Sequence, residues 1–244
     1  MDTIRVSSIV ELFGLIEEIK NEKKDVFDRS VQFMGSKLII FRGQNQNYDL
    51  LPKIARCENH LGLVSQEAKM IEELRLRGQT YYDISSLDDW DSLVVAQHYG
   101  MATRLLDWTL NPLVALWFAC KDKSVNKSSY VYILTPSESM PLLNKSKILS
   151  PKNQTKTSIL RPNLNNPRVI AQNGWFTAHI ASRKYSEIVP LNKNEEIKKE
   201  LVAVKIPPKK RTSILQELDI LGVNYQTMFP DIEGVCKHLN WLKL

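Results

Sequence analysis

The chain has 244 residues, of which 43% are hydrophobic, so the composition predicts one folded globular domain spanning residues 1–244 and excludes disorder as its dominant state. A net charge of +6 permits nucleic acid as a partner, although the glutamates among the lysines before Arg211 are also typical of a solvated face. Three distant cysteines without a CxxC pair suggest neither a zinc site nor a disulfide framework and favour a cytoplasmic location, and the lack of an apolar run of about 18 residues predicts no membrane span.

An amphipathic helix is predicted near the N-terminus, over residues 8–28. The apolar residues that share one face of it are Ile9, Leu12, Phe13 and Ile16. Ser7 or Ser8 is expected to cap its start, and Glu11 has the position of a capping-box partner. The acidic residues within the apolar stretch exclude a signal peptide.

Helices and strands are also predicted along the rest of the chain. The first strand is expected at Leu38–Phe41. Further helices are predicted at Ser65–Gly78, at Ser92–His98, after Asn111, and at Lys210–Gly222. Further strands are predicted at Ser129–Pro136, Gly174–Ile180 and Glu200–Pro207. The polar stretch Ser137–Asn166 is expected to be a long exposed excursion.

Arg42 directly follows the first predicted strand and precedes Gly43. A strand that is apolar throughout is buried on both faces, so the next residue is expected to emerge at an edge where a ligand can reach it. A guanidinium in that place is either a structural fork or an anion clamp, because it can bind phosphate oxygens in a bidentate geometry.

A dense group of polar residues lies between two predicted helices in the stretch 96–119. Its members are His98, Tyr99, Thr103, Arg104, Asp107, Trp108, Thr109 and Asn111. Burying such groups unpaired costs about 1–3 kcal/mol each, so they must bond to one another or to a ligand. An Arg104–Asp107 ion pair that pins a turn is one expectation, and a ligand site is the other.

Five motifs together resemble the FRG domain family over residues 37–239. They are "FRGQ" at 41–44, "LLP" at 50–52, "AQHYG" to "NPLVALWFA" at 96–119, "AQNGWFT" at 171–177, and "LGV" to "MFPDIEG" at 221–234. The resemblance implies a component of a bacterial toxin–antitoxin or phage-defence locus. The order of the motifs is also similar to that of ADP-ribosyltransferases, which implies an α+β fold with a split antiparallel sheet core and a helical N-terminal elaboration.

The resemblance to ADP-ribosyltransferases implies that NAD is the substrate. It implies that the NAD-binding residues are Arg42, Gly43, Tyr99, Thr103, Arg104 and Asp107. Tyr99 is expected either to stack on nicotinamide or to serve as a structural tyrosine. The implied catalytic acid is Glu233 or Asp231 in "PDIEG", where the enzymes have a glutamate, although Asp231 after Pro230 is also placed to cap the closing helix.

The acceptor of ADP-ribose is expected to be RNA, or less plausibly a protein, and an antitoxin is a further expected partner. Basic stretches and aromatic residues suit single-stranded RNA, because phosphate contacts and base stacking supply its affinity. The competing hypothesis is a non-catalytic module of a defence system that uses Arg42 and the Arg104–Asp107 group to bind a nucleotide or a protein.

Overall fold

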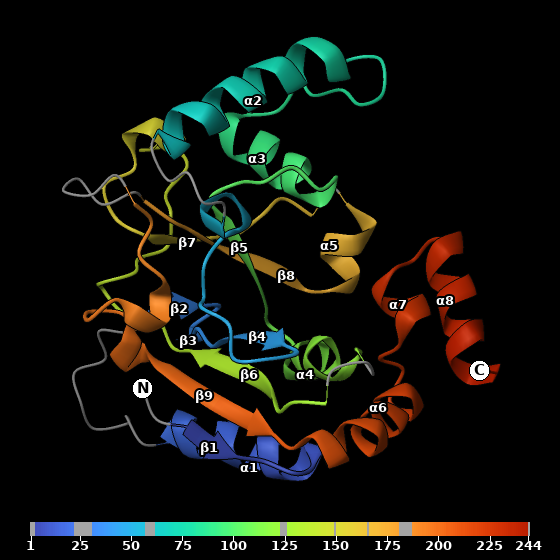
Figure 1. The fold of residues 1–244 in the computed structure, drawn as a ribbon. Coiled ribbons are helices and arrows are strands. Elements are labelled where there is room, and N and C mark those ends of the chain that lie inside the picture. The colour runs from blue at the N-terminus through green and yellow to red at the C-terminus, as the bar shows by residue number, and fades with distance from the viewer. Residues whose placement is uncertain are drawn as a thin grey trace.

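A computed structural model describes residues 3–21, 31–56, 62–122, 126–148, 150–164, 166–180 and 187–243. Seven strands form one sheet in the order β1-β9-β6-β4-β5-β8-β7 (Figure 1). Their bounds are β1 Thr3–Arg5, β4 Ile40–Gln44, β5 Leu105–Thr109, β6 Ser129–Leu134, β7 Ser158–Leu160, β8 Gly174–Ala178 and β9 Leu201–Ile206. Every neighbouring pair is antiparallel except β1 with β9. The predicted α+β class and mostly antiparallel sheet are confirmed.

The hydrogen-bonded pairing between neighbouring strands is shortest between β4 and β5. These strands pair only through Phe41 and Thr109, whereas β4 pairs along its whole length with β6, and β5 with β8. The edge of β4 that faces β5 is therefore open from Arg42 onward. This divergence leaves room for side chains, and for a ligand, between the two halves of the sheet.

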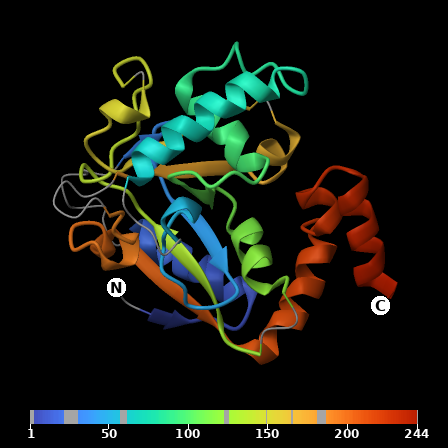
Figure 2. The same ribbon diagram turned by 45° about the horizontal axis from the view of Figure 1, so that its top comes forward.

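Helices cover both halves of the sheet (Figures 1 and 2). The helices are α1 Ile9–Asn21, α2 Leu63–Gly78, α3 Asp89–His98, α4 Pro112–Cys120, α5 Pro167–Ala171, α6 Arg211–Ile220, α7 Tyr225–Met228 and α8 Ile232–Lys243. On one side of the junction between β4 and β5, a hydrophobic core joins α1, α4 and α6 to β4, β6 and β9. On the other side, α2 and α3 pack over β5, β7 and β8. None of the helices described here is both long and apolar enough to cross a membrane.

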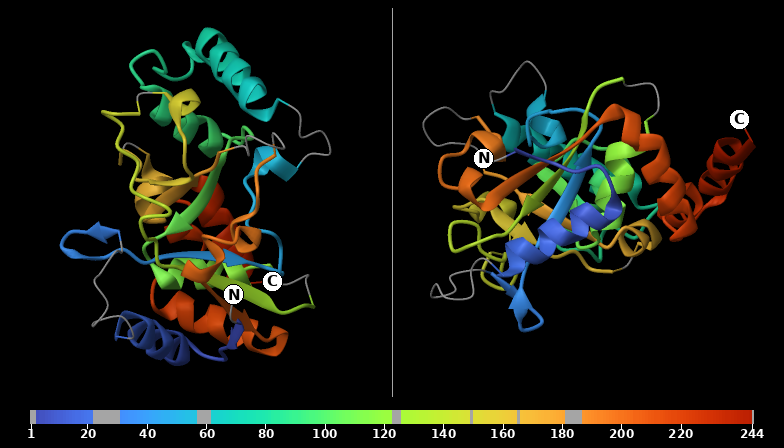
Figure 3. Two further views of the ribbon diagram at one scale, coloured as in Figure 1. Left: turned by 90° about the vertical axis from the view of Figure 1, so that its left-hand side faces the viewer. Right: turned by 90° about the horizontal axis from the view of Figure 1, so that it is seen from below.

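The shorter elements lie at the periphery. Strands β2 Gln32–Phe33 and β3 Ser36–Lys37 form a hairpin that projects from the body, and α8 extends away from it at the C-terminus (Figure 3). Single turns of 3₁₀ helix are η1 Lys53–Arg56, η2 Pro151–Asn153, η3 Leu191–Lys193, η4 Lys198–Glu200 and η5 Pro208–Lys210.

The capping residues expected from the sequence mark the starts of α1 and α4. Ser8 Oγ accepts from the Glu11 amide at 3.2 Å, and Glu11 Oε2 accepts from the Ser7 amide at 2.8 Å, so the cap of α1 is confirmed. The predicted continuation toward Asp28 lies outside the described residues from residue 22. Asn111 caps α4 by accepting from the Leu113 amide at 2.9 Å.

The first predicted strand is displaced along the chain. Strand β4 begins at Ile40 and continues through Arg42, which pairs with Tyr132 of β6. The expectation that Arg42 follows the strand is therefore wrong. Its side chain still lines a pocket, because β5 diverges from β4 at this position.

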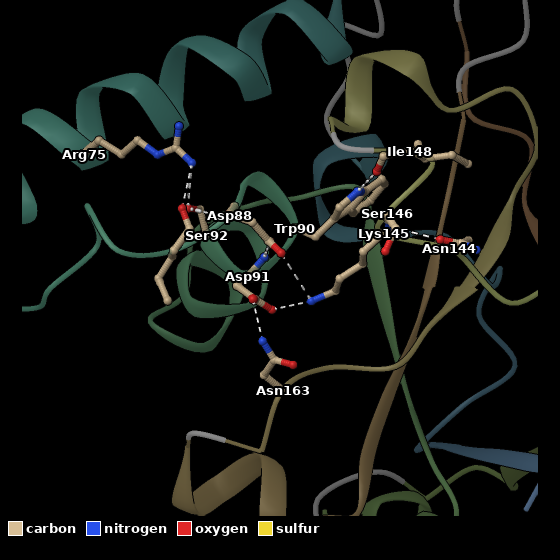
Figure 4. Close-up of polar contacts among 11 residues, drawn as sticks. Arg75, Asp88, Trp90, Asp91, Ser92, Asn144, Lys145, Ser146, Ile148 and Asn163 are labelled. Atoms are coloured by element: carbon tan, nitrogen blue, oxygen red, sulfur yellow. Dashed lines mark hydrogen bonds and ion pairs between the residues drawn. The ribbon is translucent and has the colours of Figure 1, made fainter.

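The stretch predicted as an exposed excursion, Ser137–Asn166, is partly a sheet edge, because it contains the buried strand β7. The same stretch is tied to α3 through Asp91, whose side chain is buried (Figure 4). Asp91 accepts hydrogen bonds from Lys145 Nζ and Asn163 Nδ2, both at 2.6 Å. The polar residues of this stretch therefore did not make all of it exposed, because the buried carboxylate of Asp91 holds Lys145 and Asn163 against α3.

Candidate functional site

A pocket of about 350 Å³ lies where β4, β5 and β8 meet α3, α4 and α5. The polar residues that line it are Arg42, Gln97, His98, Asp107, Thr109, Arg168 and Gln172. Aromatic residues supply much of the remaining wall, namely Phe41, Trp108, Phe118, Trp175, Phe176 and Phe229. A mainly apolar wall with a few polar groups is typical of a small-molecule site.

Arg42 lies at the point where β4 and β5 diverge. Its Nη1 donates to the main-chain oxygen of Asp107 at 2.7 Å and lies 3.7 Å from Asp107 Oδ2. Within the described residues, Nε and Nη2 have no hydrogen-bond partner, and Nε is buried. Burial lowers the pKa of Arg42, and the carboxylate of Asp107 opposes that shift. A guanidinium remains charged after such a shift, so Arg42 presents a cation with an unused donor beside the pocket.

The side chain of Asp107 is oriented by a chain of two hydrogen bonds. Gln97 Nε2 donates to Asp107 Oδ1 at 2.8 Å, and Thr103 Oγ1 in turn donates to Gln97 Oε1. The side chain of Asp107 nevertheless remains 64% exposed, and Asp107 lines the pocket. Thr103 itself is fully buried and lies outside the pocket, so its contribution is to orient Gln97.

The expected Arg104–Asp107 pair is wrong. Arg104 Nε pairs with Glu67 Oε2 of α2 at 2.5 Å, and both side chains are less than 5% exposed. Side chains alternate between the faces of a strand, so positions 104 and 107 point to opposite faces. Arg104 therefore supports the packing of α2 and lies outside the pocket. Burial raises the pKa of Glu67, and Arg104 opposes that shift.

Tyr99 also lies outside the pocket. It follows α3, is 69% exposed, and contacts the rings of His98 and Tyr82 edge to face at centroid distances of 5.0 and 6.2 Å. Its neighbour His98 lines the pocket instead. Burial lowers the pKa of His98, and the charge of Arg168 lowers it further, so both favour the neutral imidazole.

Gly43 has a structural role as well as a place in the pocket wall. A Cβ at this position would lie 1.8 Å from the oxygen of Ala115 and 2.6 Å from the nitrogen of Ala119. Both atoms belong to the backbone of α4, so the missing side chain is what allows α4 to lie directly against β4. The close approach brings Phe118 of α4 to the pocket.

The two implied catalytic acids lie beyond the pocket wall, at the start of α8. Asp231 Oδ1 accepts from the Gly234 amide at 2.8 Å, so the expected helix cap is confirmed. Asp231 Oδ2 pairs with Arg168 Nη2 at 2.5 Å, and this hydrogen bond is the main cause of the lowered pKa of Asp231. Glu233 is 60% exposed, pairs with Lys237 at 2.5 Å, and lies 3.9 Å from Arg168. Arg168 thus stands between both carboxylates and the pocket.

Residues that the sequence reasoning missed form a cationic rim around Phe229. Arg168 lies 5.2 Å from the centre of this ring, Lys121 5.8 Å and Lys237 5.9 Å. Lys121 directly follows α4, Arg168 lies in α5, Lys237 lies in α8, and Phe229 lies between α7 and α8. A possible signal for Arg168 was the Asn166–Pro167 pair, which is typical of a helix start and therefore marks a short helix before β8.

A second pocket of about 830 Å³ adjoins the first and shares Arg42, Gly43 and Phe118 with it. Its wall continues along the end of β4 to Tyr48 and Arg56, and on the other side to Lys121. Arg42 is therefore part of the wall of both pockets.

Comparison with known proteins gives one match. Residues 37–128 match the family model of the FRG domain. No curated protein and no solved structure matches the chain significantly. The matched region runs from β3 through α4 and includes Arg42, Gly43, Gln97 and Asp107, whereas Arg168, Asp231 and Glu233 lie beyond it.

Proposed function

Because residues 37–128 carry an FRG domain, we propose that the protein is a NAD-dependent ADP-ribosyltransferase that acts as a bacterial toxin or phage-defence effector. In this proposal the sheet, in which β4 and β5 pair through one residue each, corresponds to the split core of an ADP-ribosyltransferase-like fold. The motif order that begins with Arg42 and Gly43 on a central strand supports it.

The position of Arg42 between the two pockets is the observation that carries the proposal. NAD consists of two nucleosides joined by a pyrophosphate. A guanidinium that lines two adjoining pockets can bind the pyrophosphate while each pocket receives one nucleoside. Phe118, which lines both pockets, supplies an aromatic surface next to the same point.

ADP-ribosyl transfer breaks the bond between nicotinamide and ribose through an oxocarbenium-like state. In the proposal the pocket of about 350 Å³ receives the nicotinamide riboside, because aromatic side chains line it and a carboxylate faces it. The stacking role expected of Tyr99 passes to these aromatic residues, since Tyr99 points elsewhere.

The cationic rim around Phe229 supports RNA as the acceptor. Lys121, Arg168 and Lys237 lie beside the ring of Phe229, which lines the pocket, and phosphate contacts next to a stacking surface are what single-stranded RNA requires. A protein acceptor is the alternative. An antitoxin is a further proposed partner.

A non-catalytic nucleotide-binding module of a defence system is the second candidate. One observation favours it: Asp231 and Glu233, the carboxylates that the motif order assigns to catalysis, are both engaged in ion pairs outside the pocket. Such a module needs the clamp of Arg42 but no catalytic acid.

Transfer of label distinguishes the two candidates. The protein is expected to transfer ADP-ribose from labelled NAD to an RNA pool and to release nicotinamide, with less label on a protein pool. The measurement is label retained on each purified pool, and heat-denatured protein is the control. Binding of NAD with no labelled acceptor and no released nicotinamide would replace the transferase with the binding module.

Arg42→Lys is expected to weaken NAD binding at least about tenfold, because the charge is kept but the bidentate fork is lost. Calorimetry measures the affinity, and thermal melting verifies the fold. Arg77→Lys is the matched control, because Arg77 is an exposed arginine that pairs with Glu73 far from both pockets. A folded Arg42→Lys variant with unchanged affinity would remove Arg42 from the site.

A further inference from the structure

We propose that Asp107, and not Glu233 or Asp231, is the catalytic carboxylate of the transfer reaction. The inference rests on the proposed function and assigns a residue to its chemical step. Of the described residues that line the pocket of about 350 Å³, Asp107 alone carries a carboxylate.

The geometry of Asp107 fits a group that acts on a bound ligand. Gln97 fixes Oδ1 by a hydrogen bond of 2.8 Å, which orients the carboxylate. Oδ2 lies 3.7 Å from Arg42 Nη1, beyond hydrogen-bond distance, and accepts no hydrogen bond from the described residues. This oxygen is therefore available to a ligand group in the pocket to which the proposed function assigns the nicotinamide riboside.

The carboxylates of Asp231 and Glu233 are less available to a ligand in the pocket. Asp231 uses one oxygen to cap α8 and the other to bind Arg168. Glu233 pairs with Lys237 on the exposed side of α8, and Arg168 separates it from the pocket. To reach a ligand, either residue would have to give up its ion pair and pass Arg168.

The proposed step is base-assisted displacement at the ribose of NAD. The acceptor hydroxyl of RNA forms a bond to C1′ while the bond from C1′ to the nicotinamide nitrogen breaks. The electron pair of that bond stays on the nitrogen, so nicotinamide leaves as a neutral molecule. The proton of the hydroxyl passes to Asp107 Oδ2, and from there to water. No oxidant, reductant or metal is required.

Asp107→Asn tests the assignment. The amide keeps the size of the side chain and the main-chain oxygen that binds Arg42, but it cannot accept the proton. The transfer rate is expected to fall about 100-fold or more, with NAD affinity within about threefold and an unchanged melting temperature. Asp107→Glu keeps a carboxylate and is expected to retain more transfer than Asp107→Asn.

Two comparison variants complete the experiment. Asp89→Asn is the matched control, because Asp89 is also a partly exposed aspartate paired with an arginine, Arg75 at 2.9 Å, and it is expected to keep full activity. Glu233→Gln is expected to transfer at more than a tenth of the parent rate. If Glu233→Gln abolishes transfer while Asp107→Asn retains it, Asp107 is not the catalytic carboxylate. If the unaltered protein binds NAD but transfers nothing, the proposed function fails, and this assignment fails with it.

Discussion

Gly43→Ala is expected to lower the free energy of unfolding by about 3 kcal/mol, which corresponds to a fall in Tm of about 6–12 °C for a chain of this length. The new Cβ would lie 1.8 Å from the oxygen of Ala115. Backbone cannot rotate aside as a side chain can, so α4 must move away from β4. That movement opens the core around Phe41 and Leu116.

Gly14→Ala is the matched control for this change. Gly14 lies within α1, and no atom lies within 4 Å of the position that its Cβ would take. Alanine is a better helix former than glycine, so this variant is expected to be more stable by about 0.5–1 kcal/mol. Chemical denaturation of both variants measures the difference. Equal stability of Gly43→Ala and the unaltered protein would mean that α4 does not rest against Gly43.

The elements of this fold that could be predicted are those whose signals are local. The cap of α1 by Ser8, the start of α4 after Asn111 and the apolar run of β6 are each encoded within a few residues. The same holds for the cap of α8 by Asp231, which the position after Pro230 indicated. Such signals depend on spacing along the chain, so they can be recognised without knowing the order of the strands.

The side-chain partners could not be predicted, because they depend on which strands and helices become neighbours. Arg104 bonds to Glu67, which is 37 residues away in sequence, and Arg168 bonds to Asp231, which is 63 residues away. Strand β7 could not be predicted for the same reason. It is a three-residue stretch within a polar segment, and it forms a strand because it pairs with β8 at the edge of the sheet.

In the candidate site, individual residues could be predicted from the sequence, but their arrangement could not. Arg42 and Asp107 could be selected as site residues because polar groups beside apolar strands need partners or a ligand. Their relation to each other follows from the divergence of β4 and β5, which no local pattern encodes. The rim residues Lys121 and Lys237 are 116 positions apart in sequence and lie near Phe229 only in the folded chain, so they could not be selected in advance.

Arg104→Met is expected to lower the free energy of unfolding by about 3–5 kcal/mol, because it leaves the carboxylate of Glu67 buried without its partner. Both side chains are less than 5% exposed, so water cannot replace the guanidinium. Arg104 Nη1 also donates to the oxygen of Pro151 at 3.0 Å, and that bond is lost as well. Urea denaturation, monitored by circular dichroism, measures the loss.

The matched control is Arg77→Met on the same helix as Glu67. Arg77 pairs with Glu73 at 2.7 Å, but its side chain is 82% exposed, so a change within about 0.5 kcal/mol is expected. Combining Arg104→Met with Glu67→Gln should recover part of the stability, because glutamine is neutral yet still accepts from the Arg104 amide, as Glu67 Oε1 does at 2.6 Å. If the double variant is less stable than Arg104→Met alone, the unpaired charge of Glu67 is not the cause of the loss, and the packing of the Arg104 side chain against α2 explains it instead.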